Sequence, residues 1–576
     1  MIFRFRSSLT SCFEDAPGRL SRRLNLSQAA AEILCLRGVD TPEKAENYLT
    51  PQLKNLPDPF LLKDMDRAVA MVFKAMKRQW PVVVYGDYDV DGICATTLLV
   101  DFLKKCGIAV RWHVPNRLTE GYGLTSSGLQ KISRLVETPA LLITVDNGIS
   151  ATEEVAEAIA AGFYVIITDH HEPLGRIPEA QAVVNPKQHD CDFPFSGLSG
   201  AGVTFFFTIA LRAGLLEEGI WKKDNVPNLK NYLDLVALGT VADVMPMVDV
   251  NRILVRAGSE VLSERIRPGI WALCEEAGLR EGPVTSEDIS FRLAPRINAA
   301  GRLGSPEIAA HLLMSENIST SQQSARTLEE KNKERRDIEG KIVTEAIKQC
   351  VTQVEQGACG LVVYQNDWHP GVLGIVASRL CEQFHLPAIA LADDHEPGIV
   401  KGSGRSVEGF NLLAAVRDCE KLLVHFGGHE QAIGLAMNLN TLKEFSSMFN
   451  NQLSLQENKN RKKDKVLVID RQLSGNEPDE NFLAFLKHLE PFGNGNPEPV
   501  FLTKNIKLER VSLVKKKHLR FAVKLGNTRF QGIGFGMEDK MQLVGERVDL
   551  AFVFKHSCFR GRKRIEVRAI DIKPTS

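Results

Sequence analysis

Short apolar runs alternate with amphipathic segments in the first half of the chain. These runs are Val82–Tyr85, Ala140–Val145, Phe163–Thr168 and Leu233–Leu238. Runs spaced in this way predict buried strands joined by helices, that is, βαβ units around a mainly parallel sheet. We therefore expect an α/β domain here, preceded by a helical N-terminal segment that is interrupted near Pro51 to Pro59.

One long helix is predicted after this domain. Residues 316–355 contain no proline and carry Leu328, Ile338 and Ile342 at helical spacing among many charged residues. A second α/β unit should follow, and short β-type runs with Gly-bearing turns near the C-terminus predict a small barrel. A chain of 576 residues also exceeds what one hydrophobic core supports. The expected domains are 1–75, 76–315, 316–355, 356–455 and 466–576, with a polar linker at 456–465.

The formal net charge of zero hides an uneven distribution. From residue 460 onward there are 24 Lys and Arg against 14 Asp and Glu, whereas the preceding residues carry 47 against 57. A basic C-terminal domain behind an acidic body favours contact with a polyanion through that domain. A basic face that is merely solvated is the alternative.

Cysteine usage and hydropathy bear on location. The eleven cysteines include no CxxC pair, so neither a zinc knuckle nor a dithiol redox motif is indicated. Met1 to Phe13 lacks the apolar stretch of a secretory signal. The most apolar segment, Gly202 to Leu216, is too short to cross a bilayer. We expect a cytoplasmic protein with reduced thiols and no membrane association.

An acidic cluster follows the first apolar run. Asp87, Asp89 and Asp91 alternate within Gly-Asp-Tyr-Asp-Val-Asp-Gly, and in an extended segment they would project to one side. Carboxylates this close repel one another unless a cation neutralises them. An acidic turn is the structural alternative, and an EF-hand loop is disfavoured because no Glu occupies its twelfth position.

Three further motifs follow apolar runs. They are Asp146-Asn147-Gly148, Asp169-His170-His171-Glu172, and Gly239-Thr240-Val241-Ala242-Asp243. Each is unremarkable alone, because an Asp after a strand is usually a helix cap. Four such motifs at the carboxyl ends of parallel strands would share one crevice. Oxygen and imidazole ligands without thiolates suit Mg²⁺ or Mn²⁺, and their number favours two ions of the kind that hydrolyse phosphodiesters. No Walker A motif indicates a P-loop site.

These four motifs resemble motifs I to IV of the DHH phosphoesterases, and other segments resemble the RecJ branch of that superfamily. The resemblance implies that the metal ligands are Asp89, Asp91, Asp146, His170 and Asp243, with Asp146 bridging. It also implies that His171 contacts phosphate, and that Asp87 is a further acidic position of the RecJ branch.

The second α/β unit carries candidate anion-binding segments. Gly402 to Ser406 is interpreted as a loop that offers Ser403, Arg405 and Ser406, and Gly427-Gly428-His429 as a turn. Both resemble the substrate-binding part of the DHH-associated domain, as does the segment that contains His369. Between the units, a RecJ-like motif supplies candidate phosphate contacts, which are Arg296, Asn298 and Arg302. A salt-bridged hinge is the alternative for this motif.

The basic C-terminal domain interleaves cations with aromatic side chains. Lys515-Lys516-Lys517 and Arg560 to Arg564 lie among seven phenylalanines, of which at most two are expected to stack on bases while the others form the core. Basic grooves with aromatic platforms are how OB folds bind single strands, and the length and position of this domain resemble the OB domain of RecJ proteins.

The implied fold is α/β: a DHH phosphoesterase lobe with a mainly parallel sheet, a long linker helix, a DHH-associated α/β lobe and a C-terminal OB-like β-barrel. The implied activity is 5′-to-3′ hydrolysis of single-stranded DNA to 5′-mononucleotides with two Mn²⁺ or Mg²⁺ ions, in DNA repair and recombination. We expect a monomer, with a single-strand-binding protein as an implied partner. Two alternatives stay open: a DHH phosphodiesterase for short oligonucleotides or cyclic dinucleotides, and a non-catalytic replication scaffold.

Overall fold

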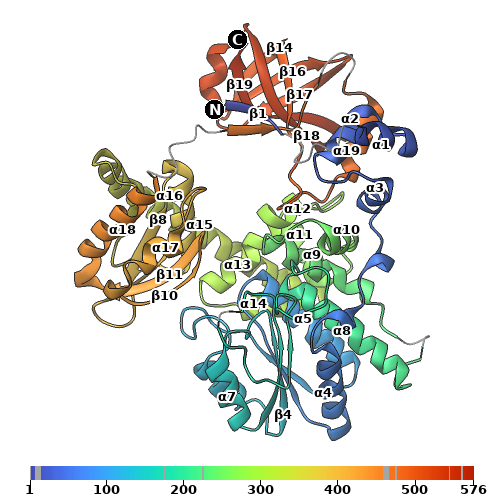
Figure 1. Cartoon of the computed structure of the whole chain (residues 1–576), viewed down its shortest axis with the longest axis vertical. Helices are drawn as coiled ribbons and strands as arrows, with labels where there is room; N and C mark the ends of the chain where they lie inside the picture. The colour runs from blue at the N-terminus through green and yellow to red at the C-terminus, as the bar shows by residue number, and fades with distance from the viewer. Residues whose placement is uncertain are drawn as a thin grey trace.

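The computed structural model describes residues 2–6, 15–173, 175–222, 226–457, 466–473, 477–543, 545–559 and 562–575. Figure 1 shows three bodies: a first lobe at the bottom of the view, a second lobe at the left and a β-barrel at the top. We use "first lobe" for residues 65–314, "second lobe" for 356–457 and "barrel" for the sheet formed after residue 470.

The first lobe is built on a five-stranded parallel sheet of order β3-β2-β4-β5-β6. Its strands are β2 (Val82–Tyr85), β3 (Val110–His113), β4 (Ala140–Val145), β5 (Phe163–Thr168) and β6 (Ala182–Val184). Alternate residues of β2 and β4 enter two different cores, one on each face of the sheet. A strand buried on both faces has a continuous apolar sequence, and the predicted parallel sheet is confirmed.

Helices cover both faces of this sheet. The helices of this lobe are α4 (Met65–Arg78), α5 (Val90–Lys105), α6 (Ser126–Ile132), α7 (Thr152–Ala160), α8 (Gly200–Glu217), α9 (Leu233–Ala242), α10 (Asp249–Glu264), α11 (Pro268–Glu276), α12 (Ser286–Asp288), α13 (Ala294–Arg302) and α14 (Glu307–Met314). Helix α8 alone, among the described residues, has the length and hydropathy of a membrane span, but 67% of that window is buried inside the lobe. Such burial is what a core helix of the lobe shows.

One predicted strand is wrong. Leu233–Leu238 belongs to α9, whose residues from Leu233 to Val241 are all buried because α5, α8 and α10 pack around them. A helix that is apolar on every side has lost the 3.6-residue pattern, so a short apolar run of this kind looks the same as a buried strand. Asp243 therefore follows the end of a helix and not the end of a strand.

The predicted long helix is present as α15 (Ile318–Glu355). Its first half packs on α11, α13 and α14, and its second half packs on β7 and α16 of the second lobe. The second lobe has a mixed sheet of order β10-β11-β9-β8-β7. Its elements are β7 (Leu361–Tyr364), α16 (Leu373–Phe384), β8 (Ala388–Asp393), β9 (Ile399–Arg405), α17 (Leu412–Arg417), β10 (Leu423–His429), β11 (Ala432–Asn438) and α18 (Leu442–Glu457).

Two segments of the second lobe differ from the prediction. Residues 402–405 lie in the sheet strand β9 rather than in a loop, and Gly427, Gly428 and His429 end the edge strand β10 rather than forming a turn. Glycine is a turn signal in a sequence, but here it allows close packing of the sheet. A Cβ on Gly402 would lie 2.2 Å from the carbonyl oxygen of Ala390 on the neighbouring strand.

The barrel is a seven-stranded sheet of order β13-β14-β18-β19-β17-β16-β15. Its elements are β13 (Arg471–Gln472), α19 (Glu480–His488), β14 (Phe501–Lys507), β15 (Glu509–Val514), β16 (His518–Leu525), β17 (Thr528–Gly534), β18 (Arg547–Phe559) and β19 (Arg562–Pro574). The predicted barrel is therefore present. Most of the polar linker falls outside the described residues.

The N-terminal segment is divided between two bodies. Its helices α1 (Ala16–Leu24) and α2 (Gln28–Cys35) share a core with the barrel, and α3 (Pro42–Leu49) follows them, whereas α4 packs on the first lobe. A strand that was not predicted, β1 (Ile2–Phe5), pairs in parallel with β12 (Val466–Ile469). Its pairing partner lies more than 460 residues away, so no local pattern indicates it.

The close crossing of α9 and α10 generates a stability prediction. A Cβ on Gly258 of α10 would lie 2.2 Å from the carbonyl oxygen of Leu233, so Gly258→Ala must push the two helices apart. We expect a destabilisation of about 1–3 kcal/mol, seen as a lower Tm. The control adds the same methyl group at Gly340 of α15, where a Cβ meets nothing within 4 Å. Gly340→Ala should stabilise by about 0.5–1 kcal/mol, and equal Tm values for both variants would contradict the assigned crossing.

Candidate metal centre and anion-binding surface

The first acidic motif does not form one extended segment. Asp87 follows β2 in a loop, but the carboxylate of Asp89 caps α5 by accepting from the backbone N–H groups of Asp91 at 3.0 Å and Gly92 at 3.1 Å. This cap starts the helix and places Asp91 in its first turn. The expectation that the three carboxylates project to one side is therefore wrong, and they enter two different clusters.

Asp91 is held by the N-terminus of α8. Its Oδ2 accepts from the N–H of Gly200 at 2.6 Å and its Oδ1 from the N–H of Ala201 at 3.0 Å. A Cβ on Gly200 would lie 2.4 Å from Asp146 Oδ1. The start of α8 thus lies close against both carboxylates, and no larger side chain fits at that position.

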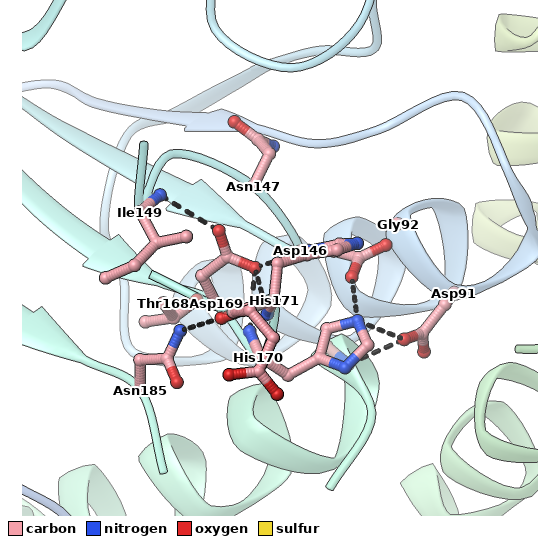
Figure 2. Close-up of polar contacts among 12 residues, drawn as sticks. Asp91, Gly92, Asp146, Asn147, Ile149, Thr168, Asp169, His170, His171 and Asn185 are labelled. Carbon is pink, nitrogen blue, oxygen red and sulfur yellow. Dashed lines mark hydrogen bonds and ion pairs between the residues drawn. The ribbon is translucent and has the colours of Figure 1, made fainter. Parts of the chain in front are cut away.

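Asp146 and His170 come from neighbouring strand ends. Asp146 follows β4 with a left-handed backbone, φ 64°, which an Asp tolerates better than most residues. His170 follows β5, and its ring lies between the carboxylates of Asp146 and Asp91 (Figure 2), with Nε2 3.0 Å from Asp146 Oδ1 and 3.9 Å from Asp91 Oδ2. The same Nε2 lies 3.6 Å from Asp243 Oδ2. The first turn of α5, the loops after β4 and β5 and the end of α9 therefore meet at one point.

Three overlapping groups among the described residues could hold a cation. Within each group the ligand atoms lie within 4.8 Å of one another. The groups are Asp87 with Asp89 and Asp146, Asp91 with His170 and Asp243, and Asp146 with His170 and His171. The first two groups share no residue with each other. The third group takes Asp146 from the first and His170 from the second, and so connects them. This arrangement offers two adjacent positions, with Asp146 within reach of both.

Several of these buried atoms have no hydrogen-bond partner. Within the described part of the chain, these include Asp87 Oδ1, His170 Nδ1 and Asp243 Oδ2. A buried polar atom without a partner costs about 1–3 kcal/mol, and the cost is larger for a charged group. The donor set of carboxylate oxygens and imidazole is the one that Mn²⁺ and Mg²⁺ accept. The residues present therefore fit a pair of divalent cations.

Burial sets the electrostatics of this cluster. Loss of solvent and the nearby Asp89 raise the pKa of Asp91 to about 7, and burial together with Asp91 raises the pKa of Asp243 to about 8. The same causes place the pKa of Asp87 and Asp146 well above its usual range. Burial and the adjacent His171 lower the pKa of His170 to about 3, so this ring is neutral, as a metal ligand must be.

His171 has a different environment from His170. Burial alone would lower its pKa, but the hydrogen bond from its Nδ1 to Asp169 Oδ1, at 2.7 Å, raises the pKa to about 9. Asp169 is itself fixed by the backbone N–H groups of Ile149 and His170. His171 Nε2 also lies 3.1 Å from the hydroxyl of Tyr122. A cationic imidazolium is thus held beside the acidic cluster.

Three arginines lie beside the cluster without a carboxylate partner. Arg302 on α13 and Arg405 on β9 are both largely withdrawn from solvent, and this burial together with the charge of Arg117 lowers the pKa of each guanidinium. Arg117 lies 5.4 Å from the ring centroid of Tyr88, the residue between Asp87 and Asp89. Within the described ranges none of the three forms an ion pair with a carboxylate, so together they offer a site for an anion. Sequence reasoning missed Arg117, which lies in a loop without a motif.

One face of the second-lobe sheet continues from Arg405. Strand register places His429, Ala432 and Arg405 in one row, Gly427, Gly434 and Ser403 in the next, and His425, Ala436 and Lys401 in a third. A Cβ on Gly427 or Gly434 would meet nothing within 4 Å. Helices α15 and α16 contact β7, β8 and β9, whereas on β10 and β11 Gly427, His429 and Gly434 are exposed. The result is a smooth glycine row between two rows of cationic or imidazole side chains.

The other predicted contacts are less available. Arg296 Nε lies 2.8 Å from Glu329 of α15, as the hinge alternative expects. His369 Nδ1 accepts from the N–H of Gly371, and the Ser406 hydroxyl donates to the carbonyl of Phe410. Asn298 is half-buried on α13 beside Arg302.

Most phenylalanines of the barrel form its core, as predicted. These are Phe501, Phe521, Phe530, Phe552 and Phe554. Phe535 is 58% exposed and packs edge-on against His518, next to Lys515, Lys516 and Lys517. Arg560 and Gly561 lie outside the described residues.

Comparison with known proteins identifies the parts of the chain. The profile described as the N-terminal domain of the DHH family matches residues 81–240, the DHHA1 domain matches 356–455, and the RecJ OB domain matches 469–571. Each match covers one of the three bodies.

Curated relatives align over nearly the whole chain. The Bacillus subtilis (strain 168) protein named single-stranded-DNA-specific exonuclease RecJ is 34% identical, over 97% of this chain and 69% of that protein. The Escherichia coli (strain K12) protein of the same name is 35% identical, over 89% of this chain and 91% of that protein.

Solved structures agree with this relationship. RecJ from Thermus thermophilus in complex with Mn²⁺ has a TM-score of 0.82 at 29% identity, over 100% of this chain and 80% of that chain. The same protein in complex with Mg²⁺ has a TM-score of 0.77 at 28% identity, over 100% of this chain and 79% of that chain. With three domain profiles in series and relatives that align over most of their length, the chain belongs to the RecJ family of DHH phosphoesterases.

Proposed function

We propose that this protein is a metal-dependent exonuclease that degrades single-stranded DNA from its 5′ end and releases 5′-mononucleotides. One observation carries the proposal: two adjacent acidic and imidazole clusters lie beside three arginines that have no carboxylate partner among the described residues. Divalent ions on one side and arginines on the other would neutralise the charge that a phosphodiester carries and develops during hydrolysis. Hydrolysis of single-stranded but not duplex DNA in the presence of Mn²⁺ is the first test.

We assign five residues to the cations and one to the phosphate. Asp89, Asp91, Asp146, His170 and Asp243 would hold two Mn²⁺ or Mg²⁺ ions, with Asp146 between them and Asp87 as a further acidic group. When bound, the ions supply a nucleophilic water at neutral pH and Lewis acidity at the phosphoryl group. His171 faces the same space as an imidazolium fixed by Asp169, so it stabilises charge on the phosphate with little reorganisation.

Direction would follow from the arginine cluster. Arg117, Arg302 and Arg405 lie on three separate elements around one space next to Tyr88 and Asp87. A terminal 5′-phosphate carries more negative charge than an internal phosphodiester, so three half-buried arginines without a carboxylate ion-pair partner among the described residues favour a chain end. A 5′ end anchored there would bring the nearest phosphodiester toward the metal centre. Asn298 lies on the same helix as Arg302 and is a candidate for further polar contact.

The remaining strand would run over the second lobe and the barrel. The glycine row Gly427, Gly434 and Ser403, flanked by His429, His425 and Lys401, accepts a sugar–phosphate backbone at close range. His369 and Ser406 are held in local turns, and we keep them as candidates at the border of this surface. On the barrel, Phe535 beside Lys515 to Lys517 offers a stacking platform with cations.

The cellular setting follows the family. We propose a monomer that acts in the cytoplasm in DNA repair and recombination, together with a single-strand-binding protein. The small-substrate alternative leaves the basic barrel without a role, because a dinucleotide needs no extended surface. The scaffold alternative leaves unexplained why each acidic ligand position is filled. Comparing hydrolysis of long single strands, duplexes and dinucleotides separates the three hypotheses.

The raised carboxylate pKa values predict a pH-dependent metal affinity. Cations bind only deprotonated carboxylates, so Mn²⁺ must displace protons from Asp91 and Asp243, whose pKa values are raised to about 7 and about 8. Titration calorimetry should show the affinity rising through this window and levelling off above it. Asp146→Asn should remove most of the binding and of the activity. An affinity that is constant from about pH 6 to about pH 9 would contradict the ligand assignment.

The raised pKa values of Asp91 and Asp243 also make the stability of the metal-free protein depend on pH. A carboxyl whose folded pKa exceeds its unfolded value of about 3.9 makes the fold bind protons more tightly than the unfolded chain. Metal-free stability should therefore fall as the pH rises from about 4 to about 8, and the Tm gain on adding Mn²⁺ should grow over that range.

Arg405 is predicted to recognise the 5′-phosphate. Arg405→Ala removes a charge-assisted contact of about 1.5–3 kcal/mol, so kcat/KM on 5′-phosphorylated oligonucleotides should fall about 10- to 150-fold. The preference for 5′-phosphate over 5′-hydroxyl ends should largely disappear. Arg417→Ala is the matched control, because Arg417 is exposed on α17, a helix of the same lobe that packs on the opposite face of the sheet. A variant that keeps the wild-type preference rules out this role for Arg405.

Gly434→Ala tests the path of the strand. The added methyl meets no neighbour in the fold, so Tm should change little, but it stands on the surface that we assign to the DNA backbone. We expect KM for long single strands to rise about threefold to tenfold, equivalent to about 0.6–1.4 kcal/mol, with Mn²⁺ affinity unchanged. Gly340→Ala adds the same group on α15 and should leave KM unaltered. Equal KM values for the two variants would show that DNA takes another route.

A further inference from the structure

The backbone directly after Asp243 is in an unusual conformation. Val244 has a φ of 56° and its side chain lies 66% exposed. The N–H of Val244 bonds the carbonyl of Val241, and the N–H of Met245 bonds the carbonyl of Thr240, each at 3.2 Å. This is a Schellman motif that ends α9, with Val244 at the left-handed position that glycine normally occupies. A β-branched residue in this region is strained, so the surroundings must hold it there.

A loop of the barrel holds this strained residue. The side-chain amide of Asn494 donates to the carbonyl of Val244 at 3.2 Å, and the carbonyl of Asn494 accepts from the N–H of Met247 at 2.7 Å. One residue thus fastens the chain on both sides of Pro246. The approach is close, because a Cβ on Gly493 would lie 2.6 Å from Met247 Cγ.

The loop that carries Asn494 is itself firmly anchored. The side chain of Asn496 is buried and donates to the carbonyls of Leu489 and Pro491, each at 2.8 Å, while accepting from the hydroxyl of Tyr48 at 2.7 Å. The hydroxyl of Ser286, from the first lobe, donates to the carbonyl of Phe492 at 2.7 Å. The loop is therefore held on one side by α3 and on the other by the first lobe.

Ion pairs tie this loop to the barrel strands. Glu498 pairs with Lys555 of β18 at 2.8 Å and with Arg568 of β19 at 3.1 Å. Both cations also pair with Glu287 of α12 in the first lobe. A continuous series of contacts therefore runs from the long β18–β19 hairpin through the loop to the residue that follows Asp243.

We propose that Asn494 is a positioning residue for the metal ligand Asp243, and that the barrel thereby completes the metal centre of the first lobe. The proposal rests on the metal site described under the proposed function. Asp243 is the C-cap residue of α9 and is not held between two strands of the sheet, so the turn at Val244 that closes the end of α9 keeps Asp243, and with it the carboxylate, in place. Asn494 stabilises that conformation by binding the carbonyl of Val244 in its left-handed geometry.

Asn494→Ala separates this role from simple attachment of the barrel. Because Asn494 is exposed, the variant should fold. Groups that orient metal ligands typically contribute about 10- to 100-fold to metal affinity, and we expect about tenfold weaker Mn²⁺ binding, measured by calorimetry without DNA. Asn55→Ala is the control, because it removes the side-chain hydrogen bond of another exposed Asn, which binds Asn47 of α3 and not the residues that follow Asp243. Its Mn²⁺ affinity should equal that of the wild type.

A second substitution tests the reason for the effect. Asn adopts the left-handed conformation more readily than Val, so Val244→Asn should reduce the need for Asn494. The affinity lost through Asn494→Ala should therefore be smaller in the Val244→Asn background than in the wild type. Equal losses in both backgrounds would overturn the strain argument, and unchanged Mn²⁺ affinity in Asn494→Ala, even with a lower Tm, would overturn the positioning role. If the wild type itself bound no Mn²⁺, the proposed metal site would fail instead.

Discussion

The structure depends on the mutual repulsion of carboxylates that the fold places together out of water. Asp87, Asp91 and Asp146 are buried, and burial with their neighbours raises the pKa of each. Without a cation this arrangement works against folding, because each charge lacks solvent and faces another of the same sign. The surrounding features reduce this cost: the N-terminus of α8 donates two N–H groups to Asp91, and His171 is held nearby as a cation. The remaining negative charge is what a pair of divalent ions neutralises.

The same constraint explains why both lobes contribute to one site. The first lobe supplies an acidic cluster, which attracts cations but repels a phosphate chain. The three arginines that we propose to bind the phosphate come from both lobes, with Arg117 and Arg302 on the first lobe and Arg405 on the second. Because α15 packs on both lobes along its length, it sets how far Arg405 stands from the metal centre. The geometry of α15 is therefore part of the geometry of the site.

Much of the fold could be predicted from the sequence, and the failures share one cause. The runs at β2, β4 and β5 and the helix α15 follow simple periodic patterns, so local reasoning found them. The helix α9 has no polar face, the glycines of β9 and β10 look like turn residues, and β1 pairs with a strand at the far end of the chain. In each case tertiary contacts determine the structure, and these contacts cannot be inferred from a short stretch of sequence.

The site was predicted unevenly for a related reason. Carboxylates that share a cation must stand at fixed positions next to secondary-structure elements, so sequence motifs mark them. The fold brings the acidic and histidine residues of the four motifs together, as the motifs implied. Positive charge for a phosphate can be supplied from many positions along a chain, and Arg117, which we propose for that role, lies in a loop that carries no motif. Arg296, which lies in a motif, pairs with Glu329. Asn494 is harder still to find, because it acts on the backbone of Val244 and is separated from it by 250 residues. A residue that positions a metal ligand through main-chain contacts belongs to no recognisable sequence motif. Its role can be inferred only from a structure in which the barrel contacts the first lobe.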